Sequence, residues 1–168
     1  MMIRKLPIIA VATVPGKAGV GVIRLSGQNL NPIVQALFQK TLQPRQATLL
    51  SLRDASDQLI DQLVAMYFVS PASFTGEDVF ELQYHGGPQL LELVMKRCLE
   101  MAKDLGLVIA EPGEFTLRAY LNNKVDLAQA EAIADLLDAQ SEAAVCGAAR
   151  SLQGAFSDDI NNLVEEIT

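Results

Sequence analysis

Two charged residues lie inside segments whose residue pattern predicts β-strands. Arg24 interrupts the apolar run at residues 20–25, and Glu81 lies within the alternating run at residues 78–85. A charged group inside a strand costs free energy unless it is paired or solvated. One interpretation is a salt bridge or a wet sheet face. The other is a pocket in which Arg24 and Lys124 bind anionic groups while Glu81 accepts two N–H donors from an amino-pyrimidinone ring.

His85, the single histidine of the chain, offers a second candidate chemistry at the end of the same run. An imidazole titrates near neutral pH and can act as a general base, and Asp78 is the acidic residue that could accompany it. Its position just before Gly86 and Gly87 also suits a histidine that simply ends a strand. We favour this structural interpretation, and the sequence offers no other acid–base pair.

Two segments come close to nucleotide-binding motifs without matching them. Residues 16–21 read Gly-Lys-Ala-Gly-Val-Gly, whereas a phosphate loop has four residues between its glycines and Ser or Thr after Gly-Lys. A dinucleotide fingerprint opens a helix, but this segment runs into a strand. We interpret it as a connection between strands, with close approach of a flat ligand as the alternative. Residues 123–126 match the N-K-x-D pattern by which many GTPases bind guanine, but they precede a helix, so we reject that role.

The elements that must position these residues alternate along the first 110 residues. β-rich or alternating runs predict strands at residues 8–14, 20–25, 49–52, 59–69, 78–85 and 107–110. Asn31 with Pro32 predicts an N-cap followed by proline at the first helical position. Pro88 predicts the start of a second helix, which Gly106 ends. Cys98 lies on the apolar face of that helix and is interpreted as a small buried hydrophobe.

The sequence changes character near residue 112. A short helix is expected at residues 115–121, and Asp126 is a plausible N-cap for an alanine-rich stripe with helical spacing that runs to the last residues. Gly147 and Gly154 weaken this pattern without ending it. The stripe has no partner helix of similar length in the sequence. We therefore expect a helical domain that begins near residue 120 and that either continues in a longer protein or pairs with another copy.

Composition, net charge and cysteine positions disfavour several classes of protein. The chain has 168 residues, half of them apolar, so it can bury a core without cross-links. Its net charge of −7 argues against a broad basic surface that binds duplex nucleic acid, but it is compatible with a local basic pocket. Cys98 and Cys146 lie far apart without neighbouring His or Cys, which disfavours a disulfide scaffold or zinc site and favours a cytoplasmic location. No apolar run is long enough for a membrane span.

Four blocks of the sequence resemble, in the same order, the N-terminal region of the tRNA-modification GTPases of the MnmE (TrmE) family. The blocks are residues 13–27, 73–88, 112–132 and 151–154. Arg24 lies in the first block, Glu81 in the second and Lys124 in the third. The blocks follow one another in one order from residue 13 to residue 154, so the match extends over nearly the whole chain and is specific.

This resemblance implies a fold and a cofactor. The implied fold is α+β, similar to the tetrahydrofolate-binding domain of glycine-cleavage T-proteins: a β-sheet domain with flanking helices at residues 1–120, which also mediates homodimerisation. The start of an all-helical domain would follow at residues 121–168. The implied cofactor is 5-formyl- or 5,10-methylene-tetrahydrofolate. Carried over by motif, its contacts would be Arg24, Glu81 and Lys124.

The resemblance also implies an activity for the longer protein. With a flavin-containing partner (MnmG, also called GidA), the family modifies position 5 of the wobble uridine U34 in certain tRNAs and hydrolyses GTP with magnesium and potassium. We find no G domain in these 168 residues and expect no GTPase activity from the chain alone. One alternative is a purely structural dimerisation module without a ligand. Another, a free-standing T-protein-like transferase, is disfavoured because it leaves the helical tail unexplained.

Overall fold

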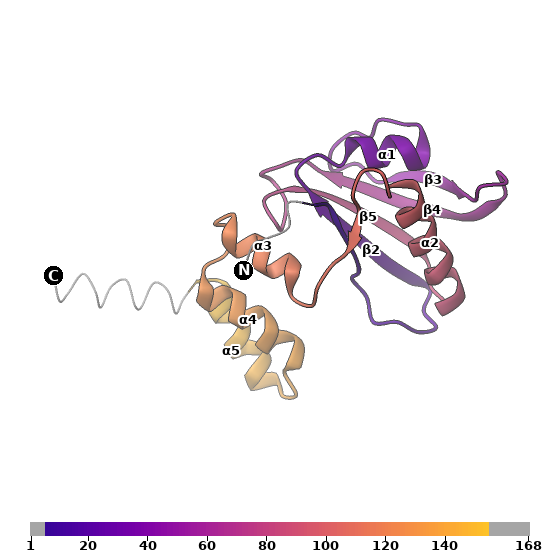
Figure 1. The fold of residues 1–168 in the computed structure, drawn as a ribbon. Helices are drawn as coiled ribbons and strands as arrows, with labels where there is room; N and C mark the ends of the chain where they lie inside the picture. Colours follow the sequence, from indigo (N-terminus) through magenta and orange to yellow (C-terminus); the bar gives the residue numbers. More distant parts are fainter. Residues whose placement is uncertain (1–5, 155–168) are drawn as a thin grey trace, which may run out of the picture. The chain divides into compact units, whose positions relative to one another are not determined.

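The computed structural model describes residues 6–154, and the chain divides into two compact units (Figure 1). The first unit spans Met1–Phe115 and the second Thr116–Thr168. The first contains a six-stranded sheet with helices packed on it, and the elements described in the second are helices. The chain is therefore α+β, as predicted.

One mixed sheet forms the frame of the first unit. Its strands are β1 (Ile8–Val11), β2 (Val20–Gly27), β3 (Thr48–Arg53), β4 (Leu59–Phe68), β5 (Asp78–His85) and β6 (Val108–Ile109). The order across the sheet is β3-β4-β5-β2-β1-β6, and the neighbouring strands are antiparallel except for the parallel pair β1 and β6. All six predicted strands are present, and β2 and β5 are the central pair for the site.

β1 is shorter than predicted, because it ends at Val11 and not at residue 14. The backbone N–H of Ala12 still donates to the carbonyl of Val22 at 2.8 Å. One residue later, the side chain of Thr13 takes the place of a backbone acceptor, because its hydroxyl accepts the N–H of Val22 at 3.0 Å. The chain thus leaves the sheet with the N–H and the carbonyl of Val22 both hydrogen-bonded.

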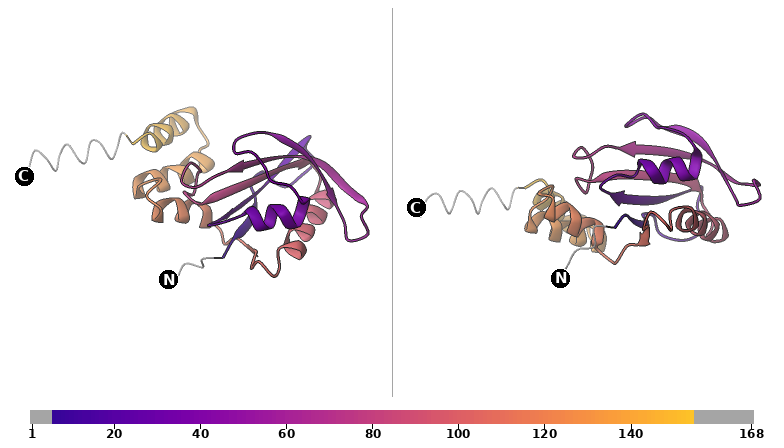
Figure 2. Two further views of the ribbon diagram at one scale, coloured as in Figure 1. Left: turned by 90° about the horizontal axis from the view of Figure 1, so that it is seen from above. Right: turned by 45° about the horizontal axis from the view of Figure 1, so that its top comes forward.

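Two helices cover one face of the sheet (Figure 2). They are α1 (Asn31–Phe38) and α2 (Pro88–Met101), which contact each other and the strands beneath them. Ile33 and Val34 from α1, and Val94 and Cys98 from α2, pack in a core with the inward side chains of the strands. Full burial of Cys98 confirms its interpretation as a core residue.

The start of α1 differs from the prediction. The N-cap is Leu30, and Asn31 is the first helical residue. The side chain of Asn29 accepts the N–H of Asn31 at 3.2 Å, and Asp78 from β5 accepts the N–H of Leu30 at 3.4 Å. No side chain of residues 6–154 caps α1, because the N–H groups of Ile33 and Val34 donate to the carbonyl of Leu30 at 3.0 Å. A buried carboxylate from a distant strand instead holds the N–H of the N-cap residue. α2 begins at Pro88 as predicted.

The opposite face of the central strands is only partly buried. Along β2, Gly21, Ile23 and Leu25 are buried, whereas Val22 and Arg24 between them are half-exposed. β5 shows the same alternation and places Glu81 on this second face. The period of two residues follows from strand geometry. It gives the sheet one closed face and one partly exposed face, on which apolar residues such as Val22 and Met66 lie beside the charged pair.

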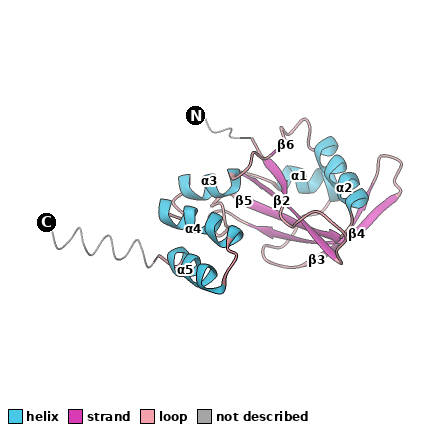
Figure 3. Ribbon diagram, turned by 90° about the horizontal axis from the view of Figure 1, so that it is seen from below, coloured by secondary structure: helices cyan, strands magenta, loops and turns pink. Residues whose placement is uncertain are grey.

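The second unit is described as three helices. They are α3 (Glu114–Leu121), which begins in the first unit, α4 (Leu127–Asp138) and α5 (Glu142–Leu152). α4 and α5 lie side by side (Figure 3), and the amide of Gln129 donates to the carbonyl of Leu152 at 3.0 Å. No helix among residues 6–154 is long and apolar enough to cross a membrane.

The stripe predicted for this unit is interrupted once within the described residues. Ala139 and Ser141 have extended backbone, and the Ser141 hydroxyl caps α5 by accepting the N–H of Ala144 at 3.2 Å. α5 ends at Leu152, two residues before Gly154, whose φ is 92°. The prediction that Gly154 does not end the helix was therefore wrong. The predicted continuation of the stripe at residues 156–167 lies outside the described residues.

Candidate functional site

The register of the central strands brings Arg24 and Glu81 together. The two residues are directly opposite each other in the antiparallel pair of β2 and β5. Arg24 Nε donates to Glu81 Oε1 at 2.8 Å, and Nη2 lies 2.7 Å from the same oxygen. The side chains are 33% and 16% exposed, so the pair lies at the surface of the half-open face. This is the salt bridge that the sequence left open as one interpretation.

The other oxygen of the Glu81 carboxylate has no partner in the part of the chain that the structure describes. Both Arg24 contacts end on Oε1, and no further hydrogen bond reaches Glu81. A carboxylate can accept through both oxygens, so Oε2 keeps its full capacity to accept N–H donors. Arg24 holds the charge of the carboxylate in place, and Oε2 can bind a ligand.

A loop after β4 lies beside this pair. Phe74 presents its ring to Arg24, with the guanidinium carbon 5.9 Å from the ring centroid. Next to it, the hydroxyl of Ser26 donates to Glu77 Oε2 at 2.7 Å. Since a serine has one proton, Thr75 is the donor in the second contact of Ser26, also 2.7 Å long. The loop is thus fastened to β2 two residues beyond Arg24.

Asp78 anchors the same loop from inside the core and has no catalytic partner. It is 7% exposed and accepts the Tyr67 hydroxyl at 2.5 Å and the N–H of Ser70 at 2.9 Å, in addition to Leu30. Burial and, second, the hydrogen bond to Asp78 raise the pKa of the Tyr67 hydroxyl well above its ordinary value. Asp78 therefore fixes structure by joining the loop, β4 and the start of α1.

His85 pairs with a residue that the sequence did not single out. Its Nδ1 lies 2.8 Å from Oδ1 of Asp61, and its backbone N–H donates to Oδ2 at 3.0 Å. The Asp61 side chain is 8% exposed while that of His85 is 73% exposed. Asp61 thereby binds both the ring and the backbone at the end of β5. His85 is therefore hydrogen-bonded to Asp61 and not to Asp78. This pairing supports the interpretation of His85 as a structural residue.

The glycine-rich connection between β1 and β2 passes close to the end of β5. A Cβ built on Gly86 would lie 2.2 Å from the carbonyl oxygen of Ala18, so only glycine allows the two backbones to approach. In contrast, a Cβ on Gly16 or Gly19 would meet nothing within 4 Å. A Cβ on Gly21, at the start of β2, would lie 2.3 Å from the ring of Tyr84. The need for glycine in this region therefore comes from close packing at Gly86 and Gly21.

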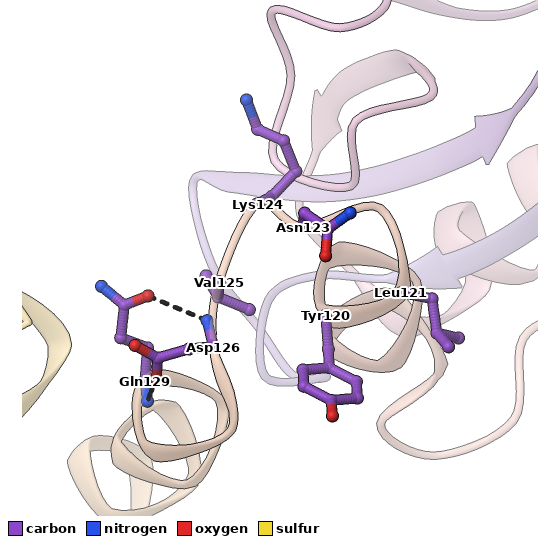
Figure 4. A pocket seen from close by; sticks show the side chains of 7 residues that line it. All are labelled: Tyr120, Leu121, Asn123, Lys124, Val125, Asp126 and Gln129. Carbon is purple, nitrogen blue, oxygen red and sulfur yellow. Dashed lines mark hydrogen bonds between the residues drawn. The ribbon is translucent and has the colours of Figure 1, made fainter. Parts of the chain in front are cut away.

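Lys124 lies in the turn between α3 and α4, in the second unit (Figure 4). The turn forms because Asn123 adopts a left-handed conformation, with φ of 54°, and Lys124 N–H donates to the carbonyl of Ala119 at 2.8 Å. Asp126 and Gln129 then form a reciprocal capping box, with bonds of 2.8 and 2.9 Å, which confirms Asp126 as an N-cap.

These residues line an open pocket of about 540 Å³ on the second unit. The side chain of Lys124 is exposed and points away from Tyr120 and Gln129, as Figure 4 shows. Of the three predicted site residues, the structure joins Arg24 and Glu81 directly, and it assigns Lys124 to the other unit. Among residues 6–154, no group of three or more His, Cys, Asp or Glu side chains could hold a metal ion.

Comparison with known proteins gives a consistent result. A family model described as "GTP-binding protein TrmE N-terminus" matches residues 7–124. A protein of Polynucleobacter asymbioticus named "tRNA modification GTPase MnmE" is 79% identical over the full chain, and a protein of the same name from Polaromonas naphthalenivorans is 55% identical over 96% of it. The match covers 37% and 36% of these two relatives, so the chain spans little more than a third of their length.

Proposed function

Because this chain belongs to the MnmE (TrmE) family of tRNA-modification GTPases, we propose that it binds a one-carbon tetrahydrofolate, 5-formyl- or 5,10-methylene-tetrahydrofolate, at the Arg24–Glu81 pair. The observation that carries the proposal is the carboxylate oxygen Oε2 of Glu81. It is held on a half-open sheet face by Arg24 and has no partner among the described residues.

The chemistry of Glu81 suits the amino-pyrimidinone edge of a folate. That edge presents neighbouring N–H donors, and an ionised carboxylate accepts such donors through short, charge-assisted hydrogen bonds. Glu81 binds the ring in this proposal, and Arg24 orients the Glu81 carboxylate. Folate supplies the one-carbon unit, and the residues of this chain bind and orient it.

Lys124 is the third proposed contact, and its role is electrostatic. An exposed ammonium group attracts carboxylates such as those in the glutamate tail of a folate. Lys124 belongs to the second compact unit, and its contact with the ligand is proposed from the family resemblance. We assign folate binding and homodimerisation to residues 1–120 and the beginning of a helical domain to residues 121–168.

The wider role proposed for the protein comes from its relatives, which are named as tRNA modification GTPases. We propose that the longer protein acts in the cytoplasm with a flavin-containing partner, MnmG, on position 5 of wobble uridine U34 in tRNA. Binding and hydrolysis of GTP, with magnesium and potassium, would belong to segments beyond these 168 residues. This chain would contribute the bound folate and the dimer contact.

The competing function is a dimerisation module that binds no ligand, in which Arg24 and Glu81 only satisfy each other. Titration of the chain with 5-formyl-tetrahydrofolate by isothermal calorimetry separates the two proposals, with 4-aminobenzoyl-glutamate, which lacks the pterin ring, as the matched ligand. Saturable binding of the folate, and much weaker binding of the ringless compound, is expected. No binding of either ligand by a chain that sediments as a dimer would favour the structural module. Equal binding of both ligands would contradict recognition of the pterin ring by Glu81.

A further inference from the structure

Phe74 lies against the guanidinium group of Arg24 at the partly exposed face of the sheet. Its ring centroid is 5.9 Å from Cζ of Arg24, and the residue is 38% exposed. A cation within about 6 Å of an aromatic face is attracted by the ring electrons. Because Phe74 is not buried in the core, its position is explained better by the contact with Arg24 than by the packing of the sheet.

The backbone that carries Phe74 is tied down on both sides. The hydroxyl of Ser73 donates to the carbonyl of Glu77, and that of Ser70 to the carbonyl of Gly76, at 2.5 and 2.8 Å. Thr75 and Glu77 are hydrogen-bonded to Ser26 of β2. These contacts hold the loop against the strand that carries the arginine, so the ring is presented to the guanidinium by a fixed backbone.

The contact of Phe74 with Arg24 bears on which oxygen of Glu81 the arginine binds. An arginine and a carboxylate commonly pair through two parallel bonds that use both oxygens. In this structure Nε and Nη2 of Arg24 both end on Oε1 of Glu81. Ala10 lies opposite Arg24 on β1, and its methyl group is too short to hold the guanidinium from that side. The ring of Phe74, 5.9 Å from Cζ of Arg24, supplies a contact from the side of the loop.

We propose that Phe74 is a positioning residue of the folate site, an inference that rests on the function proposed above. By covering Arg24, the ring keeps the guanidinium on Oε1 of Glu81 and leaves Oε2 for the N–H donors of the amino-pyrimidinone. Without the ring, the flexible arginine side chain can occupy both oxygens or turn to solvent. Phe74 thus acts on the ligand through Arg24 and Glu81.

The test compares the wild-type chain with Phe74→Met and Phe74→Leu in calorimetric titrations with 5-formyl-tetrahydrofolate. Removing the ring is expected to weaken binding roughly twofold to fivefold, the size of a half-exposed cation–π contact. Phe74→Tyr keeps the ring and should restore wild-type affinity. The matched control is Phe68→Leu, which removes the other ring paired with an arginine, 5.4 Å from Cζ of Arg45; it should leave the affinity unchanged.

A second ligand distinguishes positioning from direct contact or general destabilisation. The 2-desamino analogue of 5-formyl-tetrahydrofolate lacks one of the donors that Oε2 of Glu81 would accept, so the loss caused by Phe74→Met should shrink or vanish with it. An equal loss for both ligands would overturn the positioning role, and so would unchanged affinity of both ring-free variants for the natural folate. Failure of the wild-type chain to bind folate at all would instead contradict the proposed function.

Discussion

Replacing Glu81 by glutamine is the perturbation whose effect follows most directly from the site. The change preserves the size of the side chain and one oxygen for Arg24, but it places an NH₂ group where Oε2 accepts donors. Hydrogen bonds to a charged group contribute about 1.5–3 kcal/mol, and each 1.4 kcal/mol corresponds to about tenfold in affinity. We therefore expect Glu81→Gln to bind 5-formyl-tetrahydrofolate about 10- to 100-fold more weakly than the wild-type chain.

The cost to folding should be much smaller than the cost to binding. The Arg24–Glu81 pair is partly solvated, with side chains 33% and 16% exposed, so loss of the charge should lower the free energy of unfolding by about 1 kcal/mol or less. Calorimetric titration measures the affinity and urea denaturation the stability. Glu92→Gln, an exposed change on α2, is the matched control. A folded Glu81→Gln chain that binds folate within twofold of wild type would refute the assignment of Oε2.

Three further predictions concern the scaffold and can be measured without a ligand. Asp78→Leu leaves three donors without their acceptor, and urea denaturation should show a loss of at least about 2 kcal/mol. Gly86→Ala forces a clash with the facing backbone, so thermal unfolding should report about 1–3 kcal/mol of destabilisation, whereas Gly16→Ala should change stability by less than about 0.5 kcal/mol. Burial raises the pKa of the Cys98 thiol to about 12 from an ordinary value near 9. As the pH rises from 9 to 12, the thiol loses its proton in the unfolded chain but keeps it in the folded chain, so the free energy of unfolding should fall. Cys98→Ala should reduce this fall. In the native chain, a thiol reagent should modify the exposed Cys146 and spare Cys98.

Each of these expectations has an outcome that contradicts it. Wild-type stability of Asp78→Leu would mean that its donors find other acceptors. Equal effects of the Gly86 and Gly16 changes would show that the close backbone approach does not constrain the chain. Rapid reaction of both thiols under native conditions would contradict the burial of Cys98.

Much of the fold was predictable because the strands are β-rich or alternating runs with turn residues between them. The run at Asp78–His85 gave its own boundaries and the direction of each side chain, since strand geometry repeats every two residues. Proline and capping residues likewise marked the starts of α2 and α4. Alternation, proline positions and capping residues involve only residues close together in the chain, so the sequence alone predicts them.

Two details that the sequence did not predict depend on contacts between distant residues. Asn31 was predicted to cap α1, but the start of that helix is fixed partly by Asp78, which lies 47 positions later. The pairing of His85 with Asp61 depends in the same way on how β4 lies beside β5. Strand register cannot be read from local periodicity, so no local signal marked Asp61.

The candidate site was predictable as a set of residue types and only in part as an arrangement. Mid-strand charge singled out Arg24 and Glu81, and the register of β2 with β5 explains why they pair. Phe74 was visible only as part of a family motif, because its contact with Arg24 depends on a loop conformation that several distant hydrogen bonds fix. Lys124 was also proposed for the ligand, and it belongs to a different compact unit.

The central claim is that Glu81 binds the ring of a folate, and a crystal structure of the chain with 5-formyl-tetrahydrofolate tests it most directly. The account predicts the amino-pyrimidinone edge within hydrogen-bonding distance of Glu81, with Arg24 still on the other oxygen and Phe74 over Arg24. A folate bound elsewhere, with the Arg24–Glu81 pair untouched by the ligand, would contradict it.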